Sequence, residues 1–162
     1  MRQDHPDYVP LRVATYILGG GSASRLYGRI REERGLAYSV YAALDVARHG
    51  GAVTVGLQTR NEAVDEALGL VREEMLRLGR EPVDARELDL ARSYLVGSLP
   101  LRLDTTGKVT RMLLALEDHG LGLGYLDRFR ERVARVTPAD IQRVAARYLD
   151  PAGFSLVTVR GR

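Results

Sequence analysis

An arginine and a tyrosine on either side of a predicted turn are the residues of this sequence best suited to chemistry. Arg31 falls in the last turn of a predicted helix, Tyr38 lies at or near the first residue of the strand predicted to follow, and Gly35 lies between them. A helix that ends at a glycine and reverses into a strand can bring two such side chains to one place. Together they offer a permanently charged guanidinium and a phenolic donor, which suit a peptide carbonyl and the oxyanion formed from it. Neither group is a zinc ligand or a base near neutral pH, so the pair could assist peptide hydrolysis but could not perform it.

The same residues also fit a purely structural interpretation. Arg31 could form an ion pair with a nearby carboxylate, and Tyr38 could pack within the sheet. The glycines before them, Gly19, Gly20 and Gly21, either stop the preceding helix or form a linker or substrate-facing loop. Spacing alone leaves both pairs of alternatives open.

Complete catalytic and cofactor-binding motifs are missing from the sequence. It has no cysteine, and its three histidines, His5, His49 and His119, include no His-x-x-Glu-His pair, so we predict no metal site and place all three in loops or at helix ends. The glycine-rich segment does not match a dinucleotide-binding motif, because Ser24 stands where a glycine is required and a helix precedes the segment. It also lacks the Gly-Lys-Ser/Thr of a phosphate-binding loop.

Size and charge narrow the class of protein further. A chain of 162 residues is expected to form one domain, spanning residues 1–162. Its 24 basic and 21 acidic residues are interspersed and aromatic residues make up 6%, which argues against nucleic-acid binding. The sequence has no apolar run of membrane-spanning length, and its polar first residues do not resemble a secretory signal, so we expect no membrane span and a cytoplasmic location.

Hydrophobic periodicity predicts an α+β fold in which helices cover an antiparallel sheet. The helices are predicted over residues 8–18, 23–34, 61–78, 84–99, 105–120, 125–136 and 139–149, and the strands over 37–47, 52–59 and 154–160. The first two strands read as a hairpin. Expected helix caps are Ser22 or Ser24, Asp84 with Glu87, and Thr137 before Pro138. Three strands are few for so many helices, so we expect the sheet to be completed by a missing strand or by another subunit.

Several segments of the chain resemble one peptidase family. They are His5–Tyr8, Leu18–Leu26, Arg31–Tyr38 and Thr137–Ile141. In these segments the chain is similar to the C-terminal, non-zinc domain of the insulinase/pitrilysin-type zinc metallopeptidases, a family that includes the mitochondrial processing peptidase. The resemblance covers nearly the whole chain, and the block from Leu18 to Tyr38 is its most specific part.

The resemblance implies two homologous halves that face each other around a chamber and contribute different residues to the active site. One half carries an inverted His-x-x-Glu-His zinc motif, and the other supplies an arginine and a tyrosine near the scissile peptide. By position these are Arg31 and Tyr38, so zinc is expected in a partner domain or subunit and this chain alone should cleave nothing. Some relatives are scaffold proteins without peptidase activity, which leaves a structural or assembly role as the alternative.

The resemblance also bears on the edge of the sheet. Family domains begin with a strand that precedes the segment matching His5–Tyr8, and this sequence starts at that segment. The edge left without this strand would be exposed, or would pair with a second copy of the chain in a homodimer.

Overall fold

The structure, a computed structural model, describes residues 1–47 and 50–161 and has the predicted α+β architecture. In chain order its elements are α1 (Tyr8–Gly19), a π-helical turn (Tyr27–Glu32), β1 (Ala37–Ala47), β2 (Gly50–Thr59), α2 (Val64–Arg80), α3 (Ala85–Gly97), α4 (Thr106–Asp118), α5 (Tyr125–Arg135) and α6 (Pro138–Tyr148), with short 3₁₀ turns at Asn61–Ala63, Pro100–Arg102 and Pro151–Gly153. His49, which the sequence places in a loop, lies outside the described residues.

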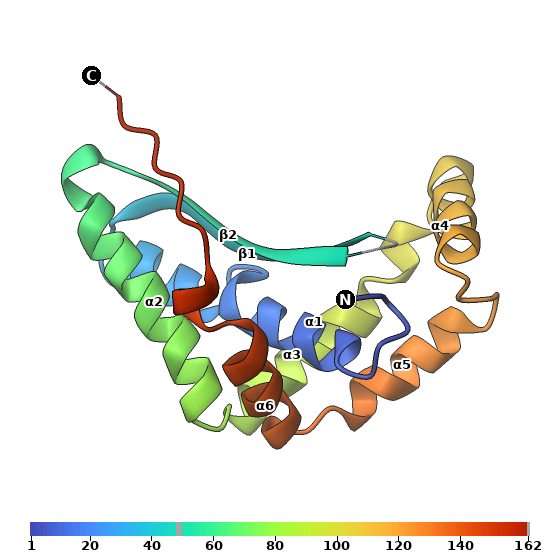
Figure 1. The fold of residues 1–162 in the computed structure, drawn as a ribbon. Coiled ribbons are helices and arrows are strands. Elements are labelled where there is room, and N and C mark those ends of the chain that lie inside the picture. Colours follow the sequence, from blue (N-terminus) through green and yellow to red (C-terminus); the bar gives the residue numbers. More distant parts are fainter. Residues whose placement is uncertain (48–49, 162) are drawn as a thin grey trace.

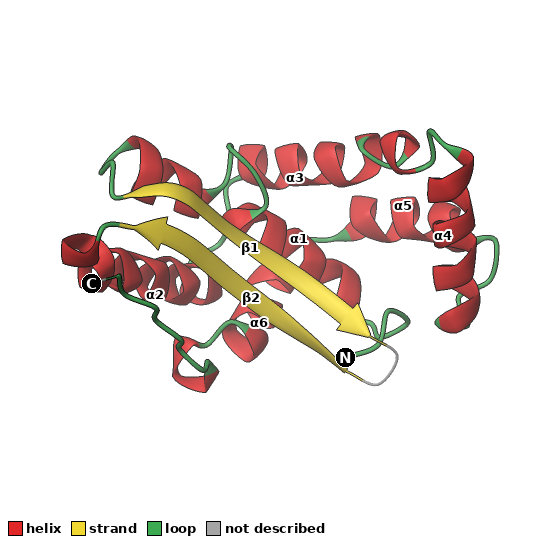
Figure 2. Cartoon of the chain, turned by 90° about the horizontal axis from the view of Figure 1, so that it is seen from above, coloured by secondary structure: helices red, strands yellow, loops and turns green. Residues whose placement is uncertain are grey.

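The strands form a long antiparallel hairpin that lies across a layer of helices. Figure 1 shows the hairpin above α1, with α2 and α6 to one side and α4 standing at the opposite end. Seen from above in Figure 2, β1 and β2 cross diagonally over α1, α2 and α6, while α3, α4 and α5 extend beyond them. The pairing runs from Ala37 opposite Thr59 to Ala47 opposite Gly50. One face of the sheet therefore packs on helices, and no helix of the described residues covers the other.

Helix α1 is the centre of the hydrophobic core. Its side chains Val13 and Leu18 are fully buried, as are Ile141 and Val144 of α6. Burial of each aliphatic side chain of this size contributes about 1.5–3 kcal/mol of hydrophobic free energy. The core thus joins the first and last helices of the chain and supports the hairpin from below.

The segment His5–Tyr8, one of those that resemble the peptidase family, connects the N-terminus to α6 through side-chain bonds. Asp7, only 5% exposed, accepts hydrogen bonds from Arg143 at 2.6 Å and from the Tyr148 hydroxyl at 2.9 Å. Burial alone would raise the pKa of Asp7, but the hydrogen bonds from Arg143 and Tyr148 outweigh it and lower this pKa. The segment therefore stabilises the fold through a paired buried carboxylate.

The helix predicted over residues 23–34 forms but is shorter, over residues 25–32, and most of it is π-helical. Residues 25–26 are α-helical and continue into Tyr27–Glu32, a π-helical turn in which the Glu33 amide donates to the Gly28 carbonyl, five residues earlier. The expected serine cap is also wrong, because the Ser24 hydroxyl donates to the Gly21 carbonyl and caps no amide of this turn. The wider turn is stabilised by ion pairs to distant helices, which local periodicity does not contain.

The third predicted strand, residues 154–160, does not form. The segment is extended but carries no ladder hydrogen bonds, and the sheet of the described residues has two strands, β1 and β2. Its alternating pattern is that of a strand, yet a strand is stable only beside a partner within hydrogen-bonding distance.

The helices of the described residues include none with the length and apolar character of a membrane span.

Candidate functional site

Arg31 and Tyr38 lie beside each other at one end of the hairpin. The guanidinium carbon of Arg31 is 5.6 Å from the ring centre of Tyr38 and 4.7 Å from that of Tyr27. An Nη atom of Arg31 also donates to the Tyr27 hydroxyl at 2.6 Å. The structure therefore brings the two predicted residues together and places a second tyrosine, Tyr27, against the Arg31 guanidinium.

Tyr38 faces solvent because it lies on a β-bulge. Ala37 is opposite Thr59 and Ser39 is opposite Gln58, so Tyr38 is the extra residue of β1. A bulge of this kind changes the direction of one side chain, and bulges are common next to active sites. Tyr38 is 80% exposed, which excludes the alternative that its ring packs within the sheet.

The turn between the two residues depends on one left-handed position. Gly35 has φ of +60°, which ends the helical segment, and the Leu36 amide then donates to the Ile30 carbonyl at 2.9 Å. The Thr59 hydroxyl donates to the Leu36 carbonyl and ties the start of β1 to the end of β2. These contacts fix the chain that carries Arg31 relative to the chain that carries Tyr38.

Ion pairs anchor the π-helical turn from below. Arg25, just before it, makes two hydrogen bonds of 2.7 Å to Glu87 of α3. Arg29 donates to Glu73 and Glu74 of α2, each at 2.9 Å. The bond to Arg25 lowers the pKa of Glu87, and the reciprocal bond raises the pKa of Arg25. Arg25 and Glu87 form two parallel bonds, the strongest kind of arginine–carboxylate pair, and together with the Arg29 pairs they join the turn to α3 and α2.

Arg31 differs from its two neighbours because it has no carboxylate partner among the described residues. Arg25 and Arg29 are neutralised by acids of α3 and α2, whereas Arg31 is exposed and bonded to a neutral hydroxyl. This excludes, within the described part of the chain, the alternative that an acid pairs with Arg31. The site thus presents an uncompensated positive charge and phenolic groups to the solvent.

The glycine segment is explained in part by packing. A Cβ on Gly19 would lie 2.4 Å from the backbone nitrogen of Ala42, and one on Gly20 would lie 2.4 Å from the ring of Tyr16. Gly19 is therefore needed for the close approach of α1 to β1. Gly21 is exposed and has only ordinary contact distances around it. It is the most exposed of the three glycines, and the predicted substrate-loop role of the segment stays a prediction.

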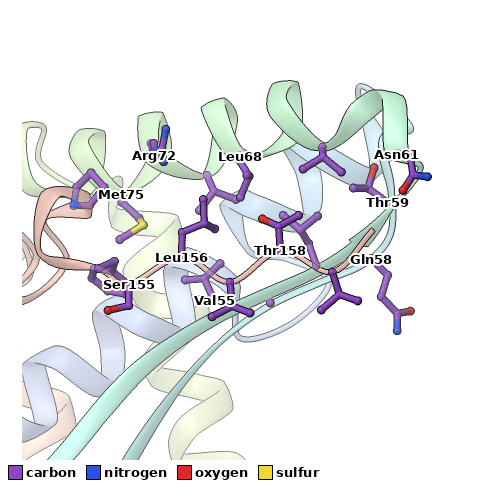
Figure 3. Close-up of a pocket in the computed structure, with 18 residues that line it drawn as sticks. Val55, Gln58, Thr59, Asn61, Leu68, Arg72, Met75, Ser155, Leu156 and Thr158 are labelled. Carbon is purple, nitrogen blue, oxygen red and sulfur yellow. The ribbon is translucent and has the colours of Figure 1, made fainter. Parts of the chain in front are cut away.

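Two hollows flank the hairpin. A shallow one of about 460 Å³ lies next to the site and is lined by Gly35–Tyr38 and Gln58–Arg60. A deeper groove of about 500 Å³ lies between β2, α2 and the extended C-terminal segment, and Figure 3 shows Val55, Leu68, Met75 and Leu156 around it. The groove is lined by apolar and polar side chains and by β2, whereas the hollow lies directly beside Tyr38, one of the candidate donors.

The described residues do not provide a metal centre. No group of three or more histidine, cysteine, aspartate or glutamate side chains is placed to hold an ion in residues 1–47 and 50–161. Arg31 and the tyrosines beside it offer hydrogen bonding and charge stabilisation.

Sequence reasoning identified Arg31 and Tyr38 but missed Tyr27. The signal was present, since Tyr27 and Arg31 are four residues apart, a spacing at which helical side chains meet. It was not decisive, because Tyr27 equally fits a core position and is in fact packed partly against the core.

Comparison with known proteins gives a consistent result. The family described as peptidase M16 inactive domain matches residues 1–95, which include Arg31 and Tyr38. An uncharacterized zinc protease of Mycobacterium tuberculosis is 31% identical over 140 residues, which are 86% of this chain and 32% of that protein. A non-peptidase homolog of Helicobacter pylori is 34% identical over 99 residues, or 61% of this chain and 23% of that protein.

Among solved structures, the peptidase M16 inactive domain from Pseudomonas fluorescens superimposes with a TM-score of 0.82 and 29% identity, and the match covers 93% of this chain and 36% of that chain. The chain spans about a third or less of the length of these proteins.

Proposed function

This chain belongs to the peptidase M16 family as an inactive domain, and we propose that it binds extended peptide and supplies Arg31 and Tyr38 as donors to a zinc-bearing partner half. The observation that carries the proposal is the placement of the uncompensated Arg31 guanidinium 5.6 Å from the exposed ring of Tyr38. Both side chains are free to meet a peptide carbonyl at the end of the hairpin.

The chemistry of these two groups suits one task in peptide hydrolysis. Negative charge develops on the carbonyl oxygen when the peptide is attacked, and fixed donors stabilise that charge more than they stabilise the ground state. Arg31 contributes a full charge with several N–H donors, and Tyr38 contributes one O–H donor. The zinc chemistry belongs to the partner half, in keeping with the name of the Mycobacterium relative as a zinc protease.

The experiment that tests this function measures cleavage by the assembled enzyme, either the full-length protein or a complex with its zinc-bearing subunit. With internally quenched fluorogenic peptides, Arg31→Ala and Tyr38→Phe should each lower kcat by about 100-fold, equivalent to about 3 kcal/mol of transition-state stabilisation. Zinc content, measured by atomic absorption, should not change. Rates equal to those of the unmodified enzyme in both variants would contradict the proposal.

A structural or assembly role is the second candidate, favoured by the relative from Helicobacter pylori that is named a non-peptidase homolog. The two functions differ in the partner that they require. Mass spectrometry of complexes purified with the tagged chain distinguishes them. Recovery of a protein with an inverted His-x-x-Glu-His motif favours the peptidase role. Recovery of partners without that motif, or of a homodimer alone, favours the scaffold.

A further inference from the structure

Tyr27 is the least exposed member of the group around Arg31. It is packed partly against the hydrophobic core, whereas Arg31 is exposed and Tyr38 is 80% exposed. A side chain anchored in the core has few rotamers available, so it can hold a more mobile neighbour in place. Tyr27 is thus the fixed point of the cluster.

Two separate contacts join Tyr27 to Arg31. The guanidinium carbon lies 4.7 Å from the ring centre of Tyr27, within the range of a cation–π interaction, and an Nη atom donates to the Tyr27 hydroxyl at 2.6 Å. The ring contact and the hydrogen bond restrict the guanidinium in two directions. No equivalent hydrogen bond joins Arg31 to Tyr38 among the contacts of the described residues, so Tyr38 is free to meet a ligand.

The nature of the partner also matters. Arg25 and Arg29, on the same stretch of chain, are held by carboxylates that cancel their charge. A phenolic hydroxyl orients Arg31 without cancelling its charge, and the oxygen accepts the bond while its own hydrogen remains available. A donor that must stabilise a developing negative charge needs this combination of fixed geometry and full charge.

We propose that Tyr27 is a positioning residue that holds the Arg31 guanidinium, fully charged, toward a peptide bound beside Tyr38. The inference rests on the proposed function, in which Arg31 stabilises the oxyanion. It adds that Arg31 acts from an orientation set before the peptide arrives, and that the hydroxyl of Tyr27 sets it.

The test combines an activity measurement with a spectroscopic one. Tyr27→Phe keeps the ring and removes the hydroxyl, so the cluster should still fold. In the assembled enzyme with fluorogenic peptides, kcat should fall about tenfold, as expected for loss of one hydrogen bond to a charged group, while KM changes less than twofold. In the ¹⁵N-labelled chain, the Arg31 guanidinium N–H resonances, assigned with Arg31→Lys, should broaden or merge in Tyr27→Phe, because rotation about the Cζ–Nη bond becomes faster.

Tyr41→Phe is the matched control. It removes a hydroxyl from another exposed tyrosine of the hairpin, whose ring lies against Gly56, and the Arg31 resonances should not change in it. Unchanged Arg31 resonances in Tyr27→Phe overturn the inference, and so does an unchanged kcat. If Arg31→Ala slows cleavage while Tyr27→Phe does not, the positioning role is wrong and the proposed function stands. If Arg31→Ala cleaves at the unmodified rate, the positioning role is wrong, and if Tyr38→Phe does so as well, the proposed function is also wrong.

Discussion

Arg31 and Tyr38 lie side by side because three local irregularities occur between Tyr27 and Ser39. Arg31 is on a π-helical turn, Tyr38 is the extra residue of a β-bulge, and Gly35 between them has φ of +60°. Each irregularity departs from regular structure, and irregular backbone of this kind is typical of functional sites. The pair is therefore a property of the turn as a whole.

Substitution of Gly35 tests the importance of that turn. Gly35→Ala should lower the free energy of unfolding by about 1–2 kcal/mol, because a residue with a Cβ is strained at positive φ. A Cβ there would meet nothing within 4 Å, so the loss comes from the backbone alone. Gly28→Ala, also in open space but at ordinary φ, is the control and should not destabilise the chain. Equal urea midpoints for the two variants would show that the turn is not under this constraint.

Gly19 provides a second test, of the packing of α1 against β1. Gly19→Ala should destabilise the chain by about 1–3 kcal/mol, because the added methyl group would lie 2.4 Å from the Ala42 backbone nitrogen. The matched control is Gly69→Ala in α2, where nothing lies within 4 Å and helix propensity favours alanine by about 1 kcal/mol. Chemical denaturation measures both. Stabilisation by Gly19→Ala would mean that α1 and β1 are not in close contact.

The sequence predicted the regular elements because their signals are local. Asp84 and Glu87 form the expected capping box, Thr137 caps the helix that starts at Pro138, and Gly35 takes the left-handed conformation expected of it. The alternation of apolar and polar residues correctly predicted the hairpin. Each of these signals lies within a few residues of the feature it predicts.

The remaining features depend on contacts far along the chain. The π-helical turn is stabilised by bonds from Arg25 and Arg29 to α3 and α2, more than 40 positions away, and a helical pattern does not reveal them. The segment 154–160 has the pattern of a strand but no neighbour to pair with among the described residues. The juxtaposition of Arg31 and Tyr38 was predicted, whereas the bulge that exposes Tyr38 was not.

The stability of the fold should depend on pH through Asp7, the buried carboxylate near the N-terminus. The pKa of Asp7 in the folded chain lies below its usual value of 3.8, so near and below pH 4 the unfolded chain binds more protons. The free energy of unfolding should therefore fall as the pH drops through this range. Asp7→Asn should lower the free energy of unfolding by about 2 kcal/mol at pH 7, because its bonds to Arg143 and Tyr148 are weaker. The difference from the unmodified chain should be smaller at pH 3.

Thermal unfolding from pH 7 to pH 3 measures this difference. Asp4→Asn, at an exposed ion pair with Arg2, is the control and should change stability little. A constant difference between Asp7→Asn and the unmodified chain across this range would show that Asp7 does not carry the acid sensitivity.

Because β2 has an unpaired edge beside the groove, we expect a strand from outside the described chain to pair with it. β2 has one unpaired edge, and Val157 and Val159 of the segment beside the groove are 85% and 92% exposed. Unpaired edges of this kind readily accept another strand. In the chain alone, the β2 amides at the unpaired edge should exchange with deuterium within seconds to minutes. In the assembled protein they should be protected at least tenfold. Protection already present in the chain alone would contradict the prediction.

In the proposed function, Arg31 and Tyr38 stabilise the transition state of peptide hydrolysis. The most direct measurement compares two ligands of the assembled enzyme, a phosphinic peptide that mimics the tetrahedral intermediate and the matching uncleaved peptide bound to zinc-depleted enzyme. Arg31→Ala should weaken the phosphinic peptide about 100-fold and the ordinary peptide by threefold or less, because the donors act on the developing oxyanion. Equal weakening of both ligands, or no weakening of the phosphinic peptide, would mean that Arg31 does not act on the oxyanion.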